Sequence, residues 1–330
     1  MRKVALAALL AGLVLVIAGC GSSSSSSSSS SAASGGGSGS ASSSTTSATA
    51  SQAAVKCPSN PITFAVEPYD EGPALEKAYS SLATDLGQKL GCKVNLVISN
   101  SYVAEIEAMR AGHVQIGEFG PLGYILAHQI ADAEPVAVFG DKSGKPDTYT
   151  AGIWVKKGSP IKTLKDLKGK TVALADTTST SGGLYPISAL INAGFKCTVN
   201  ACQGVKVVYT GGHPQSLLAL THGKADAAEI NSQQQASATA AHQFNAADYT
   251  EIWKSTPIIN DPITVYGKLP ASFQQAVQKA LLSLSASQTS TVDTELGTAS
   301  NGPMVKADNA LYDKVRGVAN SVHLTTKDLG

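Results

Sequence analysis

The sequence predicts an α/β protein with two lobes of similar build, each a mainly parallel sheet flanked by helices and connected by a two-strand hinge. Two observations predict it. Apolar stretches of strand length alternate with amphipathic helices from about residue 60 to 230, which is typical of parallel sheets covered on both faces. In addition, two segments align with each other without gaps, EIEAMRAGHVQIG (105–117) and SLLALTHGKADAA (216–228). A helix that ends at a glycine and leads into a strand is therefore predicted in both halves of the chain.

The first twenty residues indicate an export signal. Arg2 and Lys3 precede an apolar stretch from Val4 to Ala18, which is too short for an ordinary membrane span. The stretch leads into Cys20 after small residues, as in the lipobox of bacterial lipoproteins. We therefore expect residues 1–20 to be a lipoprotein signal peptide and Cys20 to carry the lipid; a plain signal peptide is the alternative.

Residues 21–55 consist almost wholly of Ser, Gly, Ala and Thr. Without large apolar groups such a segment cannot form a core. As a coil it would hold a domain roughly 30–35 Å from a membrane anchor. We expect a flexible tether.

The remaining chain is long enough for one large or two medium domains. Its net charge of +1 argues against a nucleic-acid partner. No later segment is long and apolar enough to cross a bilayer. We expect a monomer held at the extracytoplasmic face of a bacterial cell membrane by its lipid.

Four cysteines remain after Cys20, and export allows them to oxidise. Of the three possible pairings we favour Cys57 with Cys92 and Cys197 with Cys202, because the second pair closes a short loop. A zinc site is the alternative, but paired C-x-x-C spacings and His clusters are missing, and we expect no metal.

In the first lobe, periodicity predicts strands at 62–67, 93–99 and 114–119 and helices at 72–91 and 101–112. In the second lobe it predicts helices at 163–169, 182–194 and 213–223 and strands at 170–176, 204–210 and 224–230. Extended segments at 147–160 and 251–267 would form the hinge. Helices at 271–286 and 309–322 would return to the first lobe. The lobes are thus expected to comprise 56–150 with 259–330, and 151–258.

The stretch ALADTTSTSGGLYPISAL (173–190) places five hydroxyl side chains and two glycines between a strand and a helix. Backbone N–H groups at such a junction are aimed at whatever lies beyond the helix start, and oxyanions bind there. A helix cap would explain one hydroxyl but not the cluster.

Four segments resemble the periplasmic phosphonate, phosphite and phosphate binding proteins of ABC importers, which have the type II periplasmic-binding-protein fold. They are SYVAEIEAMRAGHVQIGEFGP (101–121), SPIKTLKDLKGKTVALADTTSTSGGLYP (159–186), GGHPQSLLALTHGKADAAEIN (211–231) and IWKSTPIINDPI (252–263). The resemblance implies a binding protein without enzymatic activity or cofactor, which captures a small phosphorus oxyanion between its lobes and delivers it to an ABC permease.

The resemblance also implies a set of ligand-binding residues. Ser179, Thr180 and Ser181 match the triplet that grips the anion, and His213 and Tyr102 match residues that donate to it. A surface-turn histidine and a core tyrosine are the plainer alternatives. Weaker candidates are Tyr69, Phe119 and Gln233, together with cap-type donors at Ser99, Asn100 and Ser101.

Asp261 matches an acid that selects the ligand. An ionised carboxylate only accepts hydrogen bonds, so it favours ligands that keep a P–OH or carry an amine, and it rejects sulfate. An Asp-Pro turn in the hinge is the alternative. The family's amine-binding Glu is replaced here by Gln233, which disfavours aminoethylphosphonate unless Glu229 or Glu118 faces the site.

Two other functions fit some of these residues. Ser179 or Ser181 with His213 and Asp261 could form a hydrolase triad, but the G-x-S-x-G elbow is absent. A sensory subunit that presents the same ligand to a membrane kinase would share the fold.

Overall fold

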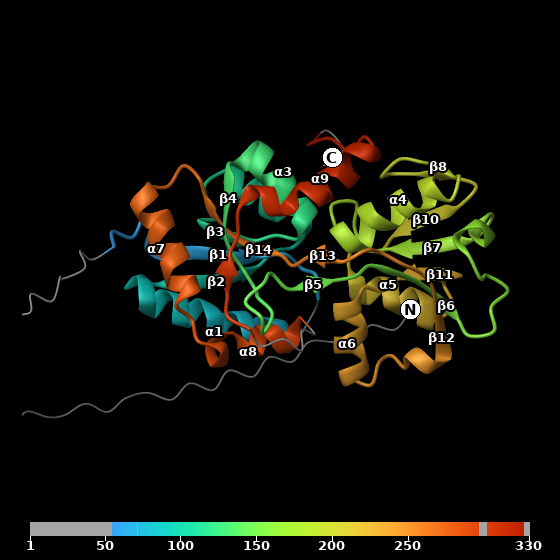
Figure 1. Cartoon of the computed structure of the whole chain (residues 1–330), viewed down its shortest axis with the longest axis horizontal. Helices are drawn as coiled ribbons and strands as arrows, with labels where there is room; N and C mark the ends of the chain where they lie inside the picture. The colour runs from blue at the N-terminus through green and yellow to red at the C-terminus, as the bar shows by residue number, and fades with distance from the viewer. Residues whose placement is uncertain (1–54, 71, 297–301, 327–330) are drawn as a thin grey trace, which may run out of the picture. The chain divides into compact units, whose positions relative to one another are not determined.

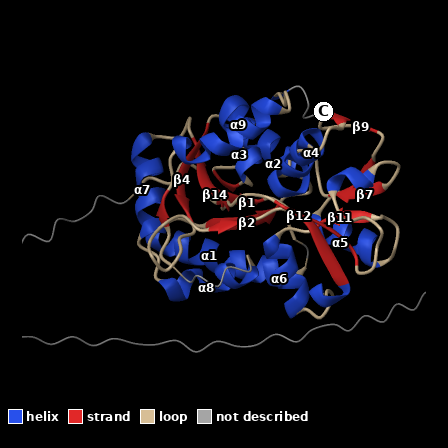
Figure 2. Ribbon diagram, turned by 45° about the vertical axis from the view of Figure 1, so that its right-hand side comes forward, coloured by secondary structure: helices blue, strands red, loops and turns tan. Residues whose placement is uncertain are grey.

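The computed structural model describes residues 55–70, 72–296 and 302–326. The predicted signal peptide, the lipidation site Cys20 and nearly all of the tether lie outside this range. The described chain contains two main sheets, each covered by helices, which lie side by side in Figures 1 and 2. Among the described residues no helix is long and apolar enough to cross a membrane.

The first sheet has the strand order β15-β4-β14-β3-β1-β2. Its strands are β1 (Ile62–Val66), β2 (Val94–Ile98), β3 (Ile116–Glu118), β4 (Ala133–Val138), β14 (Pro262–Tyr266) and β15 (Val305–Lys306). Side chains alternate along β1, so that Phe64 packs on one face and Ala65 on the other. The sheet is therefore buried on both faces.

Two groups of helices cover these faces (Figure 2). One consists of α1 (Pro73–Leu90), α7 (Ala271–Leu282) and α8 (Ala286–Glu295), and the other of α2 (Tyr102–Arg110), α3 (Pro121–Ala131) and, after the turn η4 (Asn309–Tyr312), α9 (Asp313–Ser321). Local chemistry sets their ends. Ser101 caps α2 by accepting the N–H of Ala104 at 3.1 Å, and Gly91 ends α1 in the left-handed conformation with φ 67°.

The second sheet has the order β10-β7-β11-β6-β12. Its strands are β6 (Gly152–Lys156), β7 (Thr171–Leu174), β10 (Lys206–Tyr209), β11 (Ala227–Glu229) and β12 (Tyr249–Lys254). Helix α4 (Tyr185–Asn192) and the turn η1 (Leu164–Leu167) cover one face, while α5 (His213–Thr221) and α6 (Ser232–Ala240) lie on the other. The short turn η3 (Ala246–Asp248) leads into β12.

Both sheets are mixed, which refines the expectation of mainly parallel sheets. Strands β1, β2 and β3 pair in parallel, as do β7, β10 and β11. The strands that enter each lobe from the crossing segments, β14 and β6, are inserted antiparallel to their neighbours. The physical reason is that each arrives from the other lobe, and so runs against the strands already in place.

A two-stranded pair lies between the sheets, where β5 (Thr148–Tyr149) runs antiparallel to β13 (Ile258–Ile259). The chain passes between the lobes at this pair, as expected of a hinge. The limits 150/151 and 258/259 remain our proposed lobe boundaries. Of the returning helices, α7 packs on the first lobe, whereas α9 contacts both α3 and α4.

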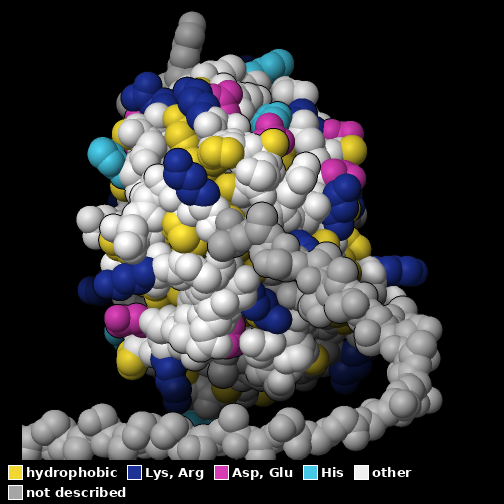
Figure 3. Space-filling model, turned by 90° about the vertical axis from the view of Figure 1, so that its left-hand side faces the viewer, with side chains coloured by type: hydrophobic (Ala, Val, Ile, Leu, Met, Phe, Trp, Pro, Cys, Tyr) yellow, Lys and Arg dark blue, Asp and Glu magenta, His cyan; other side chains and the backbone are white. Residues whose placement is uncertain are grey.

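The sequence prediction omitted α3, β4, α6 and α8. Disulfides connect Cys57 with Cys92 and Cys197 with Cys202, and the second closes a small hairpin of β8 (Lys196–Cys197) and β9 (Cys202–Gln203). On the face shown in Figure 3, Lys and Arg side chains are scattered among acidic and apolar ones. That distribution lacks the basic stripe typical of nucleic-acid binding.

Candidate functional site

A cavity between the two lobes gathers polar side chains from segments far apart in the sequence. It is lined by Glu67, Tyr69, Asp70, Gly120, Tyr149, Ser179, Thr180, Ser181, His213, Asn231, Gln233, Gln234, Ser237, Asp261 and Glu295. Of these described residues, His213 is the only one that can carry a positive charge. The walls differ in chemistry: the Ser and Thr hydroxyls and the amides come from the proposed second lobe, while the four carboxylates and the two tyrosines come from the first.

The hydroxyl wall begins where β7 ends. After Ser179 the chain enters a π-helical turn, η2 (Thr180–Leu184), that leads into α4. Gly182 is needed there, because a Cβ atom would lie 2.4 Å from the Cβ of Ala175 and 2.8 Å from Cε1 of His213. The glycines of this motif therefore allow a close approach of the backbone to His213.

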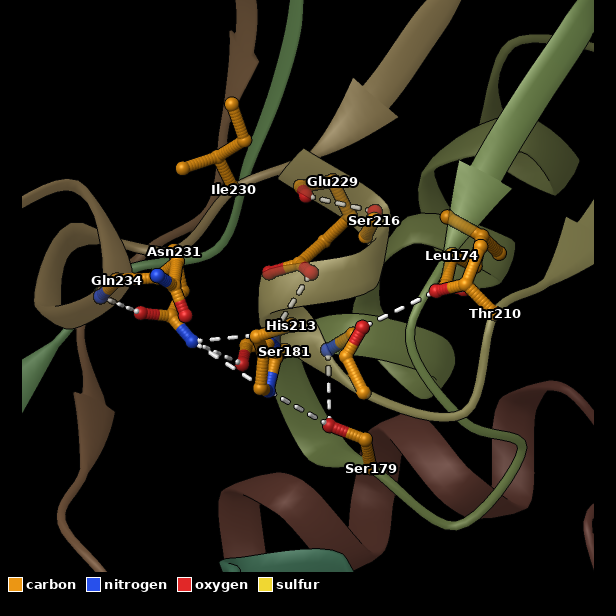
Figure 4. A network of polar contacts seen from close by, with 12 residues as sticks. Leu174, Ser179, Ser181, Thr210, His213, Ser216, Glu229, Ile230, Asn231 and Gln234 are labelled. Atoms are coloured by element: carbon orange, nitrogen blue, oxygen red, sulfur yellow. Dashed lines mark hydrogen bonds and ion pairs between the residues drawn. The ribbon is translucent and has the colours of Figure 1, made fainter. Parts of the chain in front are cut away.

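All three hydroxyls of the triplet accept hydrogen bonds from protein N–H groups, and Figure 4 shows those of Ser179 and Ser181. Ser179 Oγ accepts from the N–H of Gly182 at 3.1 Å. Thr180 Oγ1 accepts from the N–H of Leu122 at 2.8 Å, and Ser181 Oγ from Nδ2 of Asn231 at 3.2 Å. Each hydroxyl still has its one proton to donate, and all three residues line the cavity. Their O–H groups are therefore available to a ligand there, with the hydroxyls of Tyr102 and Tyr149 close by.

His213 begins α5 and is held by a buried acid. Its Nδ1 lies 2.8 Å from Oε2 of Glu229, and its Nε2 lies 3.3 Å from Oγ of Ser179. Burial lowers the pKa of His213, but the charge and hydrogen bond of Glu229 more than offset this, so the pKa is raised above its ordinary value. Glu229 thus favours an imidazolium whose Nε2–H points towards the triplet.

The opposite wall carries buried carboxylates from the first lobe. Glu67 follows β1 and is 4% exposed, and Asp261 precedes β14 and is 6% exposed. Oδ1 of Asp261 has no hydrogen-bond partner among the described residues. Burial raises the pKa of Asp261 to about 7, although the positive charge of His213 acts to lower it. Because Oδ1 of Asp261 is a buried acceptor without a donor, it suits a ligand that carries a proton to donate.

Two tyrosines lie close to this wall. Tyr149, from β5, lines the cavity; its pKa is raised well above the ordinary value by burial and then by the charges of Asp261 and Glu67. Tyr102 does not line the cavity, and its buried hydroxyl lies close to Ser179. Its predicted donation to a ligand stays a prediction.

Three hydrogen bonds connect segments on the two sides of the cavity. The Leu122 N–H at the start of α3 donates to Thr180, as described above. At the cavity mouth, Ser237 Oγ of α6 donates to Oδ2 of Asp70 at 3.2 Å. Near the hinge, Nε2 of Gln233 donates to Oδ1 of Asn260 at 2.9 Å.

The structure brings most of the predicted residues to the cavity. Those that line it are Tyr69, Ser179, Thr180, Ser181, His213, Gln233 and Asp261. Phe119 is a correction: its side chain is fully buried in the apolar cluster with α2 and α3, because alternation after β3 turns it away from the cavity. Ser101 serves instead as the cap of α2.

The two acids expected to replace the missing amine ligand have other partners. Glu229 binds His213, and Oε1 of Glu118 accepts from the hydroxyl of Tyr79 at 2.7 Å. Neither lines the cavity. The lining residues that the sequence did not predict are Glu67, Asp70, Tyr149, Asn231, Gln234, Ser237 and Glu295. Each lies just after a strand, in a hinge strand or in a helix that faces the cleft, and this position is the signal that could have identified them.

The arrangement can bind an anion without performing chemistry on it. Ser179, His213 and Glu229 have the order of a nucleophile, a base and an orienter, with Glu229 in place of the expected Asp261. However, Ser179 caps the π-helical turn, and its two neighbouring hydroxyls face the same cavity. No group of three or more potential metal ligands occurs among the described residues.

Comparisons with known proteins agree with this description. A family model described as "ABC transporter, phosphonate, periplasmic substrate-binding protein" matches residues 64–312. The phosphate-import protein PhnD of Mycolicibacterium smegmatis is 34% identical over 173 residues, covering 50% of this chain and 53% of the relative. The phosphonates-binding periplasmic protein of Escherichia coli is 31% identical over 202 residues, covering 57% and 56%. The chain thus spans about half the length of these relatives.

Solved structures share the fold. PhnD1 from Prochlorococcus marinus, in complex with methylphosphonate, superposes with a TM-score of 0.69 at 18% identity and covers 81% of this chain and 99% of its own. A binding protein component of an ABC phosphonate transporter from Pseudomonas aeruginosa gives the same TM-score at 21% identity, covering 80% and 87%. At such identities the likeness establishes the type II periplasmic-binding fold alone.

Proposed function

Because the chain belongs to the family of periplasmic phosphonate-binding proteins of ABC transporters, which bind substrates and are not enzymes, we propose that it captures a small phosphorus oxyanion in the cavity between its lobes. The candidates are phosphite, phosphate and a small alkylphosphonate. We further propose that it hands the ligand to an ABC permease outside the cell membrane, where Cys20 anchors it through a lipid.

One observation carries this proposal. Ser179, Thr180 and Ser181 each accept a hydrogen bond from a protein N–H group and line one cavity, where each keeps a proton that it can donate to a ligand. Glu229 raises the pKa of His213 and so favours its charged form, which adds a charged donor. A tetrahedral oxyanion offers enough lone pairs for all of them, and charge-assisted hydrogen bonds of this kind are among the stronger ones in proteins.

The acidic wall decides which oxyanions fit. An ionised Asp261 repels a fully ionised ligand such as sulfate, and accepts a hydrogen bond from a ligand that keeps a P–OH. Gln233 carries no charge, so its amide oxygen offers an ammonium group a weaker partner than a carboxylate would. We therefore expect phosphite, phosphate or methylphosphonate to bind more tightly than aminoethylphosphonate.

The experiment is calorimetry of the double variant Thr180→Ala with Ser181→Ala. Phosphite, phosphate, methylphosphonate, aminoethylphosphonate and sulfate are the ligands. Removing two donors should cost about 2–5 kcal/mol of binding free energy, since buried charged acceptors lose their partners. Ser188→Ala, on α4 but outside the cavity, is the matched control. Unchanged affinity in a folded double variant would refute the assignment of this site.

A further inference from the structure

Two buried carboxylates face the cavity from one edge of the first sheet. Glu67 follows the end of β1, and Asp261 precedes the start of β14. These strands flank β3 on either side, and both pair with it at Glu118 and its neighbours. Since β14 runs antiparallel to β3, its beginning lies at the same edge as the end of β1. Both carboxylates therefore reach the cavity together.

The start of α3 fixes the position of Glu67. The N–H of Gly120 hydrogen-bonds its carboxylate, and a Cβ atom at position 120 would lie 2.7 Å from Oε1 of Glu67. The glycine thus allows the acid to sit against the helix start, where a negative charge is favourable. With this contact made on one side, Glu67 still lines the cavity.

An oxyanion between these walls needs protons on its first-lobe side. Asp261 has an oxygen without a partner, and no Lys or Arg lines the cavity among the described residues. A carboxylate and a P–O⁻ group repel unless a proton lies between them. Two carboxylates against one ligand therefore call for two protons, supplied either by the ligand or by protonation of the carboxyls.

We propose that Glu67 is a second specificity-determining acid, which makes the site prefer an oxyanion with two P–OH groups, dihydrogen phosphate, over phosphite and alkylphosphonates with one and over sulfate with none. This inference rests on the proposed function. A ligand with one P–OH forces a carboxyl to take a proton from solvent, and that requirement becomes harder to meet as the pH rises. The preference for phosphate over phosphite therefore grows with pH.

The surroundings of Glu67 support this. Its pKa is raised well above the ordinary value by burial first, then by the charge of Asp261, against the hydrogen bond from Gly120, which lowers it. The titratable groups that face Glu67 and Asp261 from the adjacent elements are Glu105, Glu118, Tyr69, Tyr102, Tyr149, Tyr312 and, across the cavity, His213. Only His213 among them is a cation.

The test is Glu67→Gln, because the amide oxygen can still accept from Gly120 while the NH₂ group turns an acceptor into a donor. Inorganic phosphate and phosphite are titrated into both proteins at several pH values. The wild type should prefer phosphate, increasingly so at higher pH. In the variant the ratio of the two dissociation constants should move towards phosphite by about tenfold or more, and its pH dependence should flatten.

Asp293→Asn is the matched control, since Asp293 is a fully buried acid of the same lobe that neither lines the cavity nor is among the charges that act on Glu67 and Asp261. It should leave the ratio unchanged. If Glu67→Gln does not fold, proton uptake by the wild type, measured by calorimetry in buffers of different ionisation enthalpy, decides: phosphite should bind with about one more proton taken up than phosphate.

Three outcomes would overturn the inference: a wild type that prefers phosphite at every pH, equal proton uptake for the two ligands, or a folded Glu67→Gln protein with an unaltered ratio. In each of these cases phosphorus oxyanions still bind, so the proposed function stands. If neither ligand binds the wild type, the proposed function fails and the inference fails with it.

Discussion

Replacing Asp261 by Asn should stabilise the ligand-free protein, and should do so only above acidic pH. The carboxyl is 6% exposed and has one oxygen without a partner among the described residues. Its pKa rises from 3.8 to about 7 on burial. The folded chain therefore binds a proton that the unfolded chain has already lost at intermediate pH, and keeping Asp261 ionised in the fold costs free energy.

The size and the pH window follow from these pKa values. Below about pH 4 the carboxyl is protonated in both states and costs nothing. Between about pH 4 and pH 7 the unfolded state ionises first, so stability falls as the pH rises. Above about pH 7 the full cost is reached, on the order of 4 kcal/mol at most. Asn is of similar size and never ionises, so Asp261→Asn removes this cost.

Urea denaturation of both proteins across this pH range measures the difference. The free energy of unfolding of Asp261→Asn should exceed that of the wild type by a few kcal/mol at pH 8, and by little at pH 4. The same variant should bind sulfate more tightly, since an amide donates where a carboxylate repels. A stability difference that is independent of pH, together with unchanged sulfate binding, would show that Asp261 does not face the cavity as a buried acid.

Three further predictions concern the second lobe and the anchor. Glu229→Gln should weaken oxyanion binding by roughly tenfold or more at neutral pH. Calorimetry should show the affinity falling at a lower pH than in the wild type, because His213 then loses its proton at a lower pH. An identical pH profile would contradict the role of Glu229. Gly182→Ala should destabilise the fold by about 1–3 kcal/mol and abolish tight binding, since its Cβ would collide with Ala175; thermal unfolding and calorimetry measure both effects. Cys20→Ala should release the protein from membranes without changing its affinity in solution, and unchanged membrane fractionation would exclude lipidation there.

Much of the fold could be predicted because the signals are local. The apolar stretch at residues 62–66 identifies β1, and the glycine at position 91 marks the end of α1. The antiparallel insertion of β14 and β6 could not be predicted, since it depends on where a crossing segment enters a sheet. Helix α3 was missed because its sequence, PLGYILAHQIA, is apolar all round and lacks the amphipathic stripe on which helix prediction depends.

The site residues, too, divide into those that the sequence could predict and those that it could not. The hydroxyl triplet could be found because its residues are contiguous and share one function. Glu67 and Tyr149 could not, since nothing in a single strand end or hinge strand tells which side chains face a cleft. The sequence suggests Asp261 as a partner of His213 only in the hydrolase alternative, whereas the pairing of β11 with β7 places Glu229 beside His213. Sequence separation carries no information on such a contact.

In the proposed site, different halves of ligand recognition belong to different lobes. The second lobe supplies the donors, which any small oxyanion satisfies, so it provides affinity without much selectivity. The first lobe supplies acids, which only a protonated ligand satisfies. Thr180 connects the two, because its oxygen accepts the Leu122 N–H of the first lobe while its proton is left for the ligand. If the proposed lobes close around a ligand, this hydrogen bond forms together with the acidic wall, and we expect tight binding and discrimination to be acquired in the same step.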